Sequence, residues 1–238
     1  MMQRYFSLIR EDATFALSLE DSYHIRSVMR MHIGDFIEVV SEKKLYIASI
    51  VSLDKQVVAK VVSEKSDYNE IGFSVCLAQS LLKEQKMDLV LQKATELGAS
   101  AFIPLVVDRS IINVKGKEDK KIERWQKIVK EASEQAKRNV VPRVHSVMTV
   151  SELCQMDYDI KILCTVNEKS KNLKKILSNL QSGVTMLVVV GPEGGFTVRE
   201  EEKMIDNGFI PISLGHTVLR AETVALFLMS AIHYHDMG

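Results

Sequence analysis

The stretch "VVVGPEGGF" runs from Val188 to Phe196. An apolar run ends there in a turn that contains three glycines, one proline and one carboxylate, Glu193. Glycines placed directly after a buried strand let the backbone approach a ligand closely. Open parallel sheets bind ligands at the carboxyl ends of their strands. The stretch therefore predicts a buried strand of such a sheet, followed by a ligand-binding loop.

Strand-like and helix-like segments alternate around this stretch. Strands are expected at 73–81, 100–107, 160–166, 185–191 and 209–215. Helices with apolar residues at helical spacing are expected at 84–97, 119–138, 171–181, 198–207 and 221–235. This alternation indicates an α/β fold whose mostly parallel sheet is covered by helices on both faces.

The first 70 residues have a different pattern. Short β-rich segments at 36–42, 45–53 and 56–64 are bounded by turn signals, and one short helix is expected around 21–30. The pattern is typical of a small β-barrel. A break follows at 65–72, so we expect a barrel domain at 1–70 and a larger α/β domain at 72–238.

The composition is that of an ordinary globular protein, with 46% apolar and 26% charged residues. Its apolar runs are far shorter than the ~20 residues that span a bilayer, and the N-terminus lacks the pattern of a signal peptide. Three scattered cysteines, Cys76, Cys154 and Cys164, favour a reducing cytosol over disulfides or a zinc site. His233 and His235 fall on different faces of a predicted helix. We therefore expect a cytoplasmic protein with no membrane partner and no metal.

The charge is unevenly distributed along a chain whose formal net charge is zero. Residues 83–145 carry 14 Lys and Arg against 9 Asp and Glu. A basic middle segment hints at a polyanionic partner. A solvated helical face explains the same charges, and both interpretations stay open.

The closing helix contains "VALFLMSAI", Val224 to Ile232, and is apolar on nearly every side. Such a helix is expected to be buried all round. It either lies at the centre of the domain core or packs against a second subunit. We favour the second possibility and expect a homodimer.

Two glycine loops, "VVVGPEGG" and "ISLGHTVLRAET", end two late strands that we expect to be adjacent. At the same edge of one sheet they would form a shared small-molecule pocket. Both G-x-x-x-x-G-K-[ST] and G-x-G-x-x-G are missing, and Glu193 would repel a phosphate. A cationic ligand with hydroxyls fits better, because a carboxylate offsets its charge and accepts hydrogen bonds. S-adenosylmethionine, with its sulfonium, ammonium and ribose, is such a ligand.

Several motifs resemble those of one known family. They are "KATELGA", "RW…EASEQAKRNVVP", "GPEGGF…E" and "LG…VLRAET", preceded by "RYF" and "HIRSVMR…GD". In this order they are similar to the RsmE family, the uridine-N3 methyltransferases of small-subunit ribosomal RNA in the SPOUT superfamily. The resemblance covers nearly the whole chain. Three residues depart from the family pattern: Tyr23, Met29 and Thr217.

The resemblance implies a PUA-like, RNA-binding barrel at 1–70 and a SPOUT methyltransferase domain with a C-terminal trefoil knot at 72–238, working as a homodimer. It also implies S-adenosylmethionine as methyl donor, no metal, and N3 of a uridine in 16S ribosomal RNA as the target. Motif matching assigns the donor site to Thr165, Gly191, Pro192, Glu193, Gly194, Gly195, Leu214, Gly215, Val218, Leu219, Arg220, Ala221 and Thr223.

Four residues are candidates for catalysis. Arg220 would stabilise negative charge on the uracil, unless it forms a salt bridge at the helix start with Glu193 or Glu222. Either glutamate would act as a base or hold Arg220 in place. Arg138 would face the substrate, although a cation at a helix C-terminus is explained equally well by the helix dipole.

Candidate RNA contacts are the basic residues of the barrel and of the basic middle segment, each of which is alternatively a solvated charge. They are Arg4, Arg26, Arg30, Lys86, Lys93, Arg109 and Arg138. Two rival functions stay open. One is a SPOUT methyltransferase with another RNA target, and the other is a regulator that binds a nucleotide or RNA without catalysis.

Overall fold

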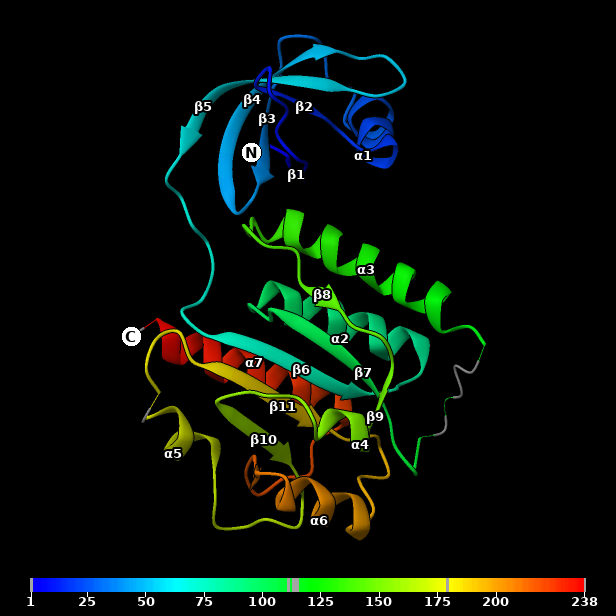
Figure 1. The fold of residues 1–238 in the computed structure, drawn as a ribbon, viewed down its shortest axis with the longest axis vertical. Helices are drawn as coiled ribbons and strands as arrows, with labels where there is room; N and C mark the ends of the chain where they lie inside the picture. The colour runs from blue at the N-terminus through cyan, green and yellow to red at the C-terminus, as the bar shows by residue number, and fades with distance from the viewer. Residues whose placement is uncertain (1, 111, 113–115, 179, 238) are drawn as a thin grey trace. The chain divides into compact units, whose positions relative to one another are not determined.

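The structure is a computed structural model that describes residues 2–110, 112, 116–178 and 180–237. Two compact units make up the chain (Figure 1). Unit 1 comprises Met1–Glu70 and Ser133–Val141, and unit 2 comprises Ile71–Ala132 and Pro142–Gly238.

Unit 1 is built on a five-stranded sheet in the order β1-β3-β4-β5-β2. β1 runs parallel to β3, and the other neighbours are antiparallel. The strands are β1 (Arg4–Phe6), β2 (Thr14–Ala16), β3 (Phe36–Ser41), β4 (Lys44–Ser52) and β5 (Val58–Lys65). β3, β4 and β5 confirm the three expected β-rich segments, whereas β1 and β2 are too short to show an alternating pattern.

One face of this sheet covers an apolar core. Ile37 and Val39 alternate with more exposed residues along β3, as expected for a half-buried strand, and Phe15 comes from β2. The expected helix at 21–30 consists of α1 (Leu19–Tyr23) and a π-helical turn, η1 (His24–Val28). Ile25 of η1 is fully buried and anchors this turn in the core.

The segment 133–141 is held in unit 1 by a buried ion pair. Arg138, only 4% exposed, donates from Nε to Oε2 of Glu70 at 3.1 Å and from Nη2 to the same oxygen. Oε1 of Glu70 accepts from the backbone N–H groups of Asn139 at 2.7 Å and Val140 at 3.0 Å. Both oxygens of this buried carboxylate are therefore bonded to one short segment.

Unit 2 is built on a parallel sheet in the order β12-β10-β11-β6-β7-β8, with β9 also pairing with β7. Every pairing is parallel, which confirms the expected α/β fold. The strands are β6 (Ser74–Ser80), β7 (Ala101–Val106), β8 (Arg143–Val144), β9 (Met148–Thr149), β10 (Ile160–Cys164), β11 (Thr185–Val190) and β12 (Phe209–Ile212).

Helices cover both faces of this sheet (Figure 1). Those of unit 2 are α2 (Glu84–Glu96), most of α3 (Glu118–Gln135), α4 (Val150–Leu153), α5 (Leu173–Leu177), α6 (Val198–Asp206) and α7 (Ala221–Asp236). α4 and α6 pack against Leu187, Val189 and Cys76 on one face. α2 and α7 contact each other, and α7 also contacts β11. β11 is consequently buried along its length, which explains its uninterrupted apolar sequence.

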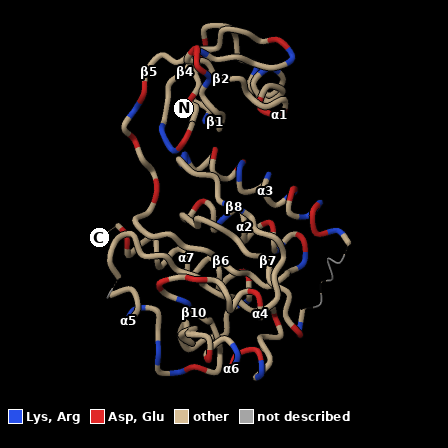
Figure 2. Tube along the Cα trace, viewed as in Figure 1, with Lys and Arg blue, Asp and Glu red and all other residues tan. Residues whose placement is uncertain are grey.

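Two details of the expected elements are wrong. α3 ends at Gln135 rather than near 138, and it carries five basic and five acidic residues, so the helix is not basic in itself (Figure 2). α5 is shorter than the helix expected at 171–181, in which residue 179 lies outside the described residues.

α7 is not buried all round within this chain. Ala225, Leu228, Met229 and Ile232 are buried, whereas Phe227 is 45% and Tyr234 is 79% exposed. The helix therefore presents one apolar face to its own domain and leaves large apolar side chains on the other. Among the described residues, no helix has the length and apolar character needed to cross a bilayer.

Replacing Arg138 by alanine should destabilise unit 1 by about 3–5 kcal/mol, because the carboxylate of Glu70 would stay buried without its cation. Chemical denaturation followed by circular dichroism measures the loss. Arg10→Ala, at an exposed site in the same unit, should change stability by less than about 0.5 kcal/mol. Equal effects of the two substitutions would contradict the structural role of the ion pair.

Candidate functional site

Three strands of unit 2 end together at one edge of the sheet. In register, Cys164 of β10 pairs with Val190 of β11 on one side and with Ile212 of β12 on the other. The chain segments that begin at Thr165, Gly191 and Ser213 therefore leave the sheet at the same level. The expected shared edge is confirmed. The expected adjacency is wrong, because β10 lies between β11 and β12.

The glycine loop after β11 is a tight turn. The N–H of Gly195 donates to the carbonyl of Pro192 at 2.9 Å, and Gly195 has a φ of +65° that favours glycine. At Gly191, a Cβ would lie 3.0 Å from the ring of buried Phe196. At Gly194, a Cβ would meet only Arg109, at 3.6 Å. A side chain at Gly191 would therefore disturb the packing of Phe196, whereas one at exposed Gly194 would begin with an ordinary van der Waals contact to Arg109.

The loop is held from outside by the segment that follows β7. Nη1 of Arg109 donates to the carbonyls of Gly194 at 2.8 Å and Phe196 at 3.1 Å. The N–H of Asp108 donates to Glu200 at 2.8 Å, and Glu200 also closes a capping box with Thr197 at the start of α6. Arg109, expected as an RNA contact, is thus bonded to the loop itself.

A three-membered ionic cluster lies beside this loop. Nζ of Lys86, on α2, is 2.7 Å from Oε1 of Glu193 and 3.4 Å from Oε2 of Glu222, in the first turn of α7. The hydrogen bond to Glu193 raises the pKa of Lys86 above its ordinary value and lowers the pKa of Glu193. Oε2 of Glu222 is buried and accepts no hydrogen bond from any described residue.

Arg220 does not form the salt bridge that the alternative interpretation expected. It is exposed at the N-cap position of α7, and within the described part of the chain it has no ion pair. Lys86 occupies the place beside Glu193 and Glu222 instead. Lys86 is 107 residues from Glu193 and still farther from Glu222 along the chain, so no local sequence pattern could reveal this ion pairing.

The remaining donor-site candidates surround the same strand ends. Thr165 donates from Oγ1 to Glu201 on α6 at 2.7 Å, so its hydroxyl is already bonded. Gly215 has a φ of +125°, and its N–H donates to Oγ of Ser213 at 3.3 Å. Ala221 is buried, Leu214 and Leu219 are partly buried, and Val218 and Thr223 are exposed. The second loop thus offers mainly backbone and apolar surface.

The candidate RNA contacts of unit 1 divide into two groups. Arg4 is buried, with Nε donating to Glu38 at 2.9 Å and Nη1 to the carbonyl of Arg138 at 3.2 Å. Burial favours a structural role for Arg4 and Arg138. Arg26 and Arg30 are exposed, and Arg30 has a φ of +51°.

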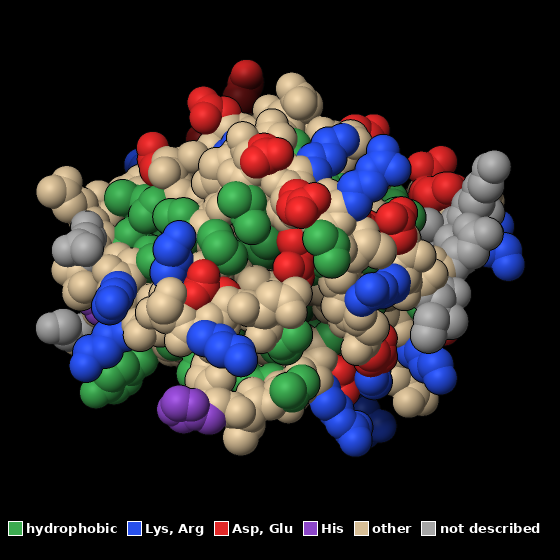
Figure 3. Space-filling model, turned by 90° about the horizontal axis from the view of Figure 1, so that it is seen from below, with side chains coloured by type: hydrophobic (Ala, Val, Ile, Leu, Met, Phe, Trp, Pro, Cys, Tyr) green, Lys and Arg blue, Asp and Glu red, His purple; other side chains and the backbone are tan. Residues whose placement is uncertain are grey.

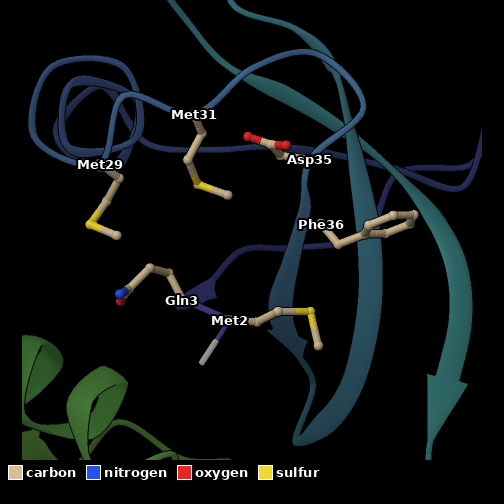
Figure 4. Close-up of a pocket in the computed structure, with 6 residues that line it drawn as sticks. All are labelled: Met2, Gln3, Met29, Met31, Asp35 and Phe36. Carbon is tan, nitrogen blue, oxygen red and sulfur yellow. The ribbon is translucent and has the colours of Figure 1, made fainter.

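A hollow of about 420 Å³ lies on the same segment of unit 1 as Arg30 (Figure 4). Three methionines and one phenylalanine dominate its lining, with two polar side chains among them. The lining residues are Met2, Gln3, Met29, Met31, Asp35 and Phe36. Apolar side chains kept at the surface around a hollow are typical of binding surfaces.

The thiols show no sign of activation. Burial raises the pKa of Cys76 to about 11 and also raises the pKa of Cys164 and of Cys154. Their thiolates are therefore disfavoured near neutral pH. Over the described residues, no group of three or more His, Cys, Asp or Glu side chains is placed to hold a metal ion.

Comparison with known proteins decides the family. The sequence profile described as "RNA methyltransferase domain" matches residues 69–233. The "Ribosomal RNA small subunit methyltransferase E" of Bacillus subtilis (strain 168) is 40% identical, over 98% of this chain and 96% of that protein. The chain belongs to this RNA methyltransferase family. The resemblance expected from its motifs is thereby confirmed.

Solved structures of two similar proteins contain the methyl donor. A putative methyltransferase from Legionella pneumophila, in complex with the cofactor SAM, is 28% identical with a TM-score of 0.88. A ribosomal RNA small subunit methyltransferase E from Neisseria gonorrhoeae, bound to S-adenosyl methionine, is 29% identical with a TM-score of 0.87. Each similarity covers 98% of both chains.

A matched pair of substitutions tests the packing of the glycine loop. Gly191→Ala should lower stability by about 1–3 kcal/mol, because its Cβ would press on buried Phe196. Gly194→Ala, three residues away, should cost less than about 1 kcal/mol, since it meets only an ordinary contact. Thermal unfolding of both variants measures the difference. Equal losses would show that Gly191 is not held by the packing of Phe196.

Proposed function

We propose that this protein transfers a methyl group from S-adenosylmethionine to N3 of a uridine in the 16S ribosomal RNA of the small subunit. The observation that carries the proposal is the convergence of three strand ends, with a glycine loop and two carboxylates, in a member of the RNA methyltransferase family. Family relatives named for small-subunit ribosomal RNA favour this target over another RNA.

The chemistry of the site fits the methyl donor. Glu193 and Glu222 supply negative charge and hydrogen-bond acceptors beside the glycine loop. Such groups suit a ligand that carries an ammonium, a sulfonium and ribose hydroxyls. The backbone at Gly194 is exposed and carries no side chain, which allows close approach. Once bound, the donor supplies a methyl group on a good leaving group.

The residues of this chain would have to favour the uracil anion. N3 of uridine is only weakly acidic, so its proton must be removed and the resulting negative charge stabilised. Arg220 is exposed beside the second loop with no ion pair to another described residue, so its guanidinium is available for this role. Much of the rate would come from holding the two reactants in line.

Unit 1 would bind the RNA. Arg26 and Arg30 are exposed cations that suit phosphates, while the Met29 and Phe36 side chains of the neighbouring hollow suit an unstacked base (Figure 4). The sheet of unit 1 is compatible with the PUA-like barrel implied by the motifs. The barrel, the trefoil knot and a cytoplasmic location remain predictions.

Unit 2 does not offer a uniformly basic surface on the side that carries α5 and α6. Seen from below, this face mixes apolar, basic and acidic side chains (Figure 3). Several cations of residues 83–145 pair with carboxylates, among them Lys86 and Arg124. Lys93, for example, pairs with Glu96 on its own helix at 2.8 Å.

Calorimetric titration with S-adenosylmethionine, S-adenosylhomocysteine and ATP tests the donor site. The first two should bind and ATP should not. Gly194→Val should abolish binding with the fold intact, because the branched side chain adds bulk to an exposed part of the loop. Circular dichroism is the control for folding. Binding of ATP alone would support a nucleotide-binding regulator, and unchanged donor affinity of Gly194→Val would refute the assignment of the loop.

The exposed face of α7 predicts a homodimer. Phe227 and Tyr234 are large side chains that the chain leaves in contact with solvent. One chain has a mass of 26.9 kDa, and size-exclusion chromatography with light scattering should give twice that mass. Replacing both residues by Asp should shift the protein toward monomer. A wild-type protein that is monomeric and active would contradict the expected pairing through α7.

A further inference from the structure

Lys86 joins three separate segments of unit 2. Its helix, α2, the glycine loop with Glu193 and the start of α7 with Glu222 meet at its ammonium group. The contacts span 107 residues from Lys86 to Glu193. The two carboxylates belong to the two loops that form the candidate donor site, so one cation bridges both halves of that site.

The backbone that carries Lys86 is firmly placed. Met87, next to it, is buried, and Val90 and Leu91 on the following turn are fully buried in the same domain. α2 also contacts α7. Glu193, in contrast, is exposed and lies in a turn between Pro192 and Gly194, outside any helix or strand. The ionic bridge therefore fastens a loop to two packed helices.

Charges of both signs meet in the cluster. Two carboxylates share the ammonium of Lys86, and the charge of Lys83 also acts on Glu193. Lys86 limits the repulsion between Glu193 and Glu222, and the hydrogen bond it donates goes to Glu193. Oε2 of Glu222 lies at the longer distance of 3.4 Å from the same ammonium. A cationic ligand would therefore meet two carboxylates that Lys86 holds close together.

We propose that Lys86 is a positioning residue of the methyl-donor site, which acts by holding the carboxylates of Glu193 and Glu222 together across the two donor loops. This inference rests on the proposed function of the same site. It replaces the expectation that Lys86 contacts RNA phosphates, because its ammonium is engaged inside unit 2.

Donor affinity measured by calorimetry should respond to the charge of Lys86. Lys86→Met should weaken S-adenosylmethionine binding at pH 7.5 by about tenfold, the size expected for losing one charge-assisted hydrogen bond in a partly buried site. Lys86→Arg keeps a cation that reaches carboxylates and should retain most of the affinity. A methionine keeps the aliphatic stem, so packing is little changed.

The pH dependence separates this role from a merely structural one. The charged groups that face the bridge are Lys83 and Lys86 at the start of α2, together with Glu193 and Glu222. In the wild type, the lowered pKa of Glu193 and the raised pKa of Lys86 keep these two groups ionised from pH 8 down to pH 5.5, so affinity should be flat. In Lys86→Met, Glu193 lacks the cation that lowers its pKa and takes up a proton more readily, so affinity should fall further as the pH is lowered.

A double-mutant cycle shows whether Lys86 acts through Glu193. In a Glu193→Gln background, Lys86→Met should cost less than threefold, because the bond it would break is already weakened. Arg124→Met is the matched control. This substitution removes the ion pair between Nη2 of Arg124 and Oδ2 of Asp88 on α2, which are 2.6 Å apart. Neither residue belongs to a donor loop, so donor affinity should be unchanged.

Two results would overturn the proposal. One is a Lys86→Met variant that binds the donor as the wild type does. The other is an effect of Lys86→Met that is as large in the Glu193→Gln background as in the wild type. If the wild type itself binds no S-adenosylmethionine, the proposed function fails first, and this inference fails with it. Wild-type binding without any effect of Lys86→Met refutes the role of Lys86 alone.

Discussion

The site depends on the parallel register of β10, β11 and β12. Because Cys164 lies level with both Val190 and Ile212, three chain segments must leave the sheet at one edge. Parallel strands end at the same edge of their sheet, so the glycine loop and the loop before α7 begin at one edge. The carboxylates of Glu193 and Glu222 then lie close enough to share the ammonium of Lys86.

Local patterns in the sequence were sufficient to predict the class of fold. The apolar run of β11 and the helical spacing of Met87, Val90 and Leu91 are local signals, and both elements are present. α4 was missed although "TVSE" carries the pattern of a capping box, in which Thr149 and Glu152 bond each other's backbone. β1 and β2, with three residues each, are too short for periodicity to reveal.

Contacts between distant residues set the limit of prediction from sequence. The sequence offers Arg138 as a substrate-facing residue or as a cation at a helix end. Its ion-pair partner, Glu70, is 68 residues away, and Arg138 is buried in unit 1. A salt bridge of Arg220 with Glu193 or Glu222 is the alternative that the sequence offers to a role at the uracil. α2 instead brings Lys86 to both carboxylates. The apolar sequence of α7 could not reveal that Phe227 and Tyr234 stay uncovered by their own chain.

The central claim is methyl transfer to a uridine of small-subunit ribosomal RNA. The most direct measurement incubates the protein with isotopically labelled S-adenosylmethionine and small ribosomal subunits that lack the modification. The RNA is then digested to nucleosides and analysed by mass spectrometry. We expect labelled 3-methyluridine, formed in 16S ribosomal RNA by the wild type and lost with Gly194→Val. A label in another nucleoside, or in 23S or transfer RNA instead, would contradict it.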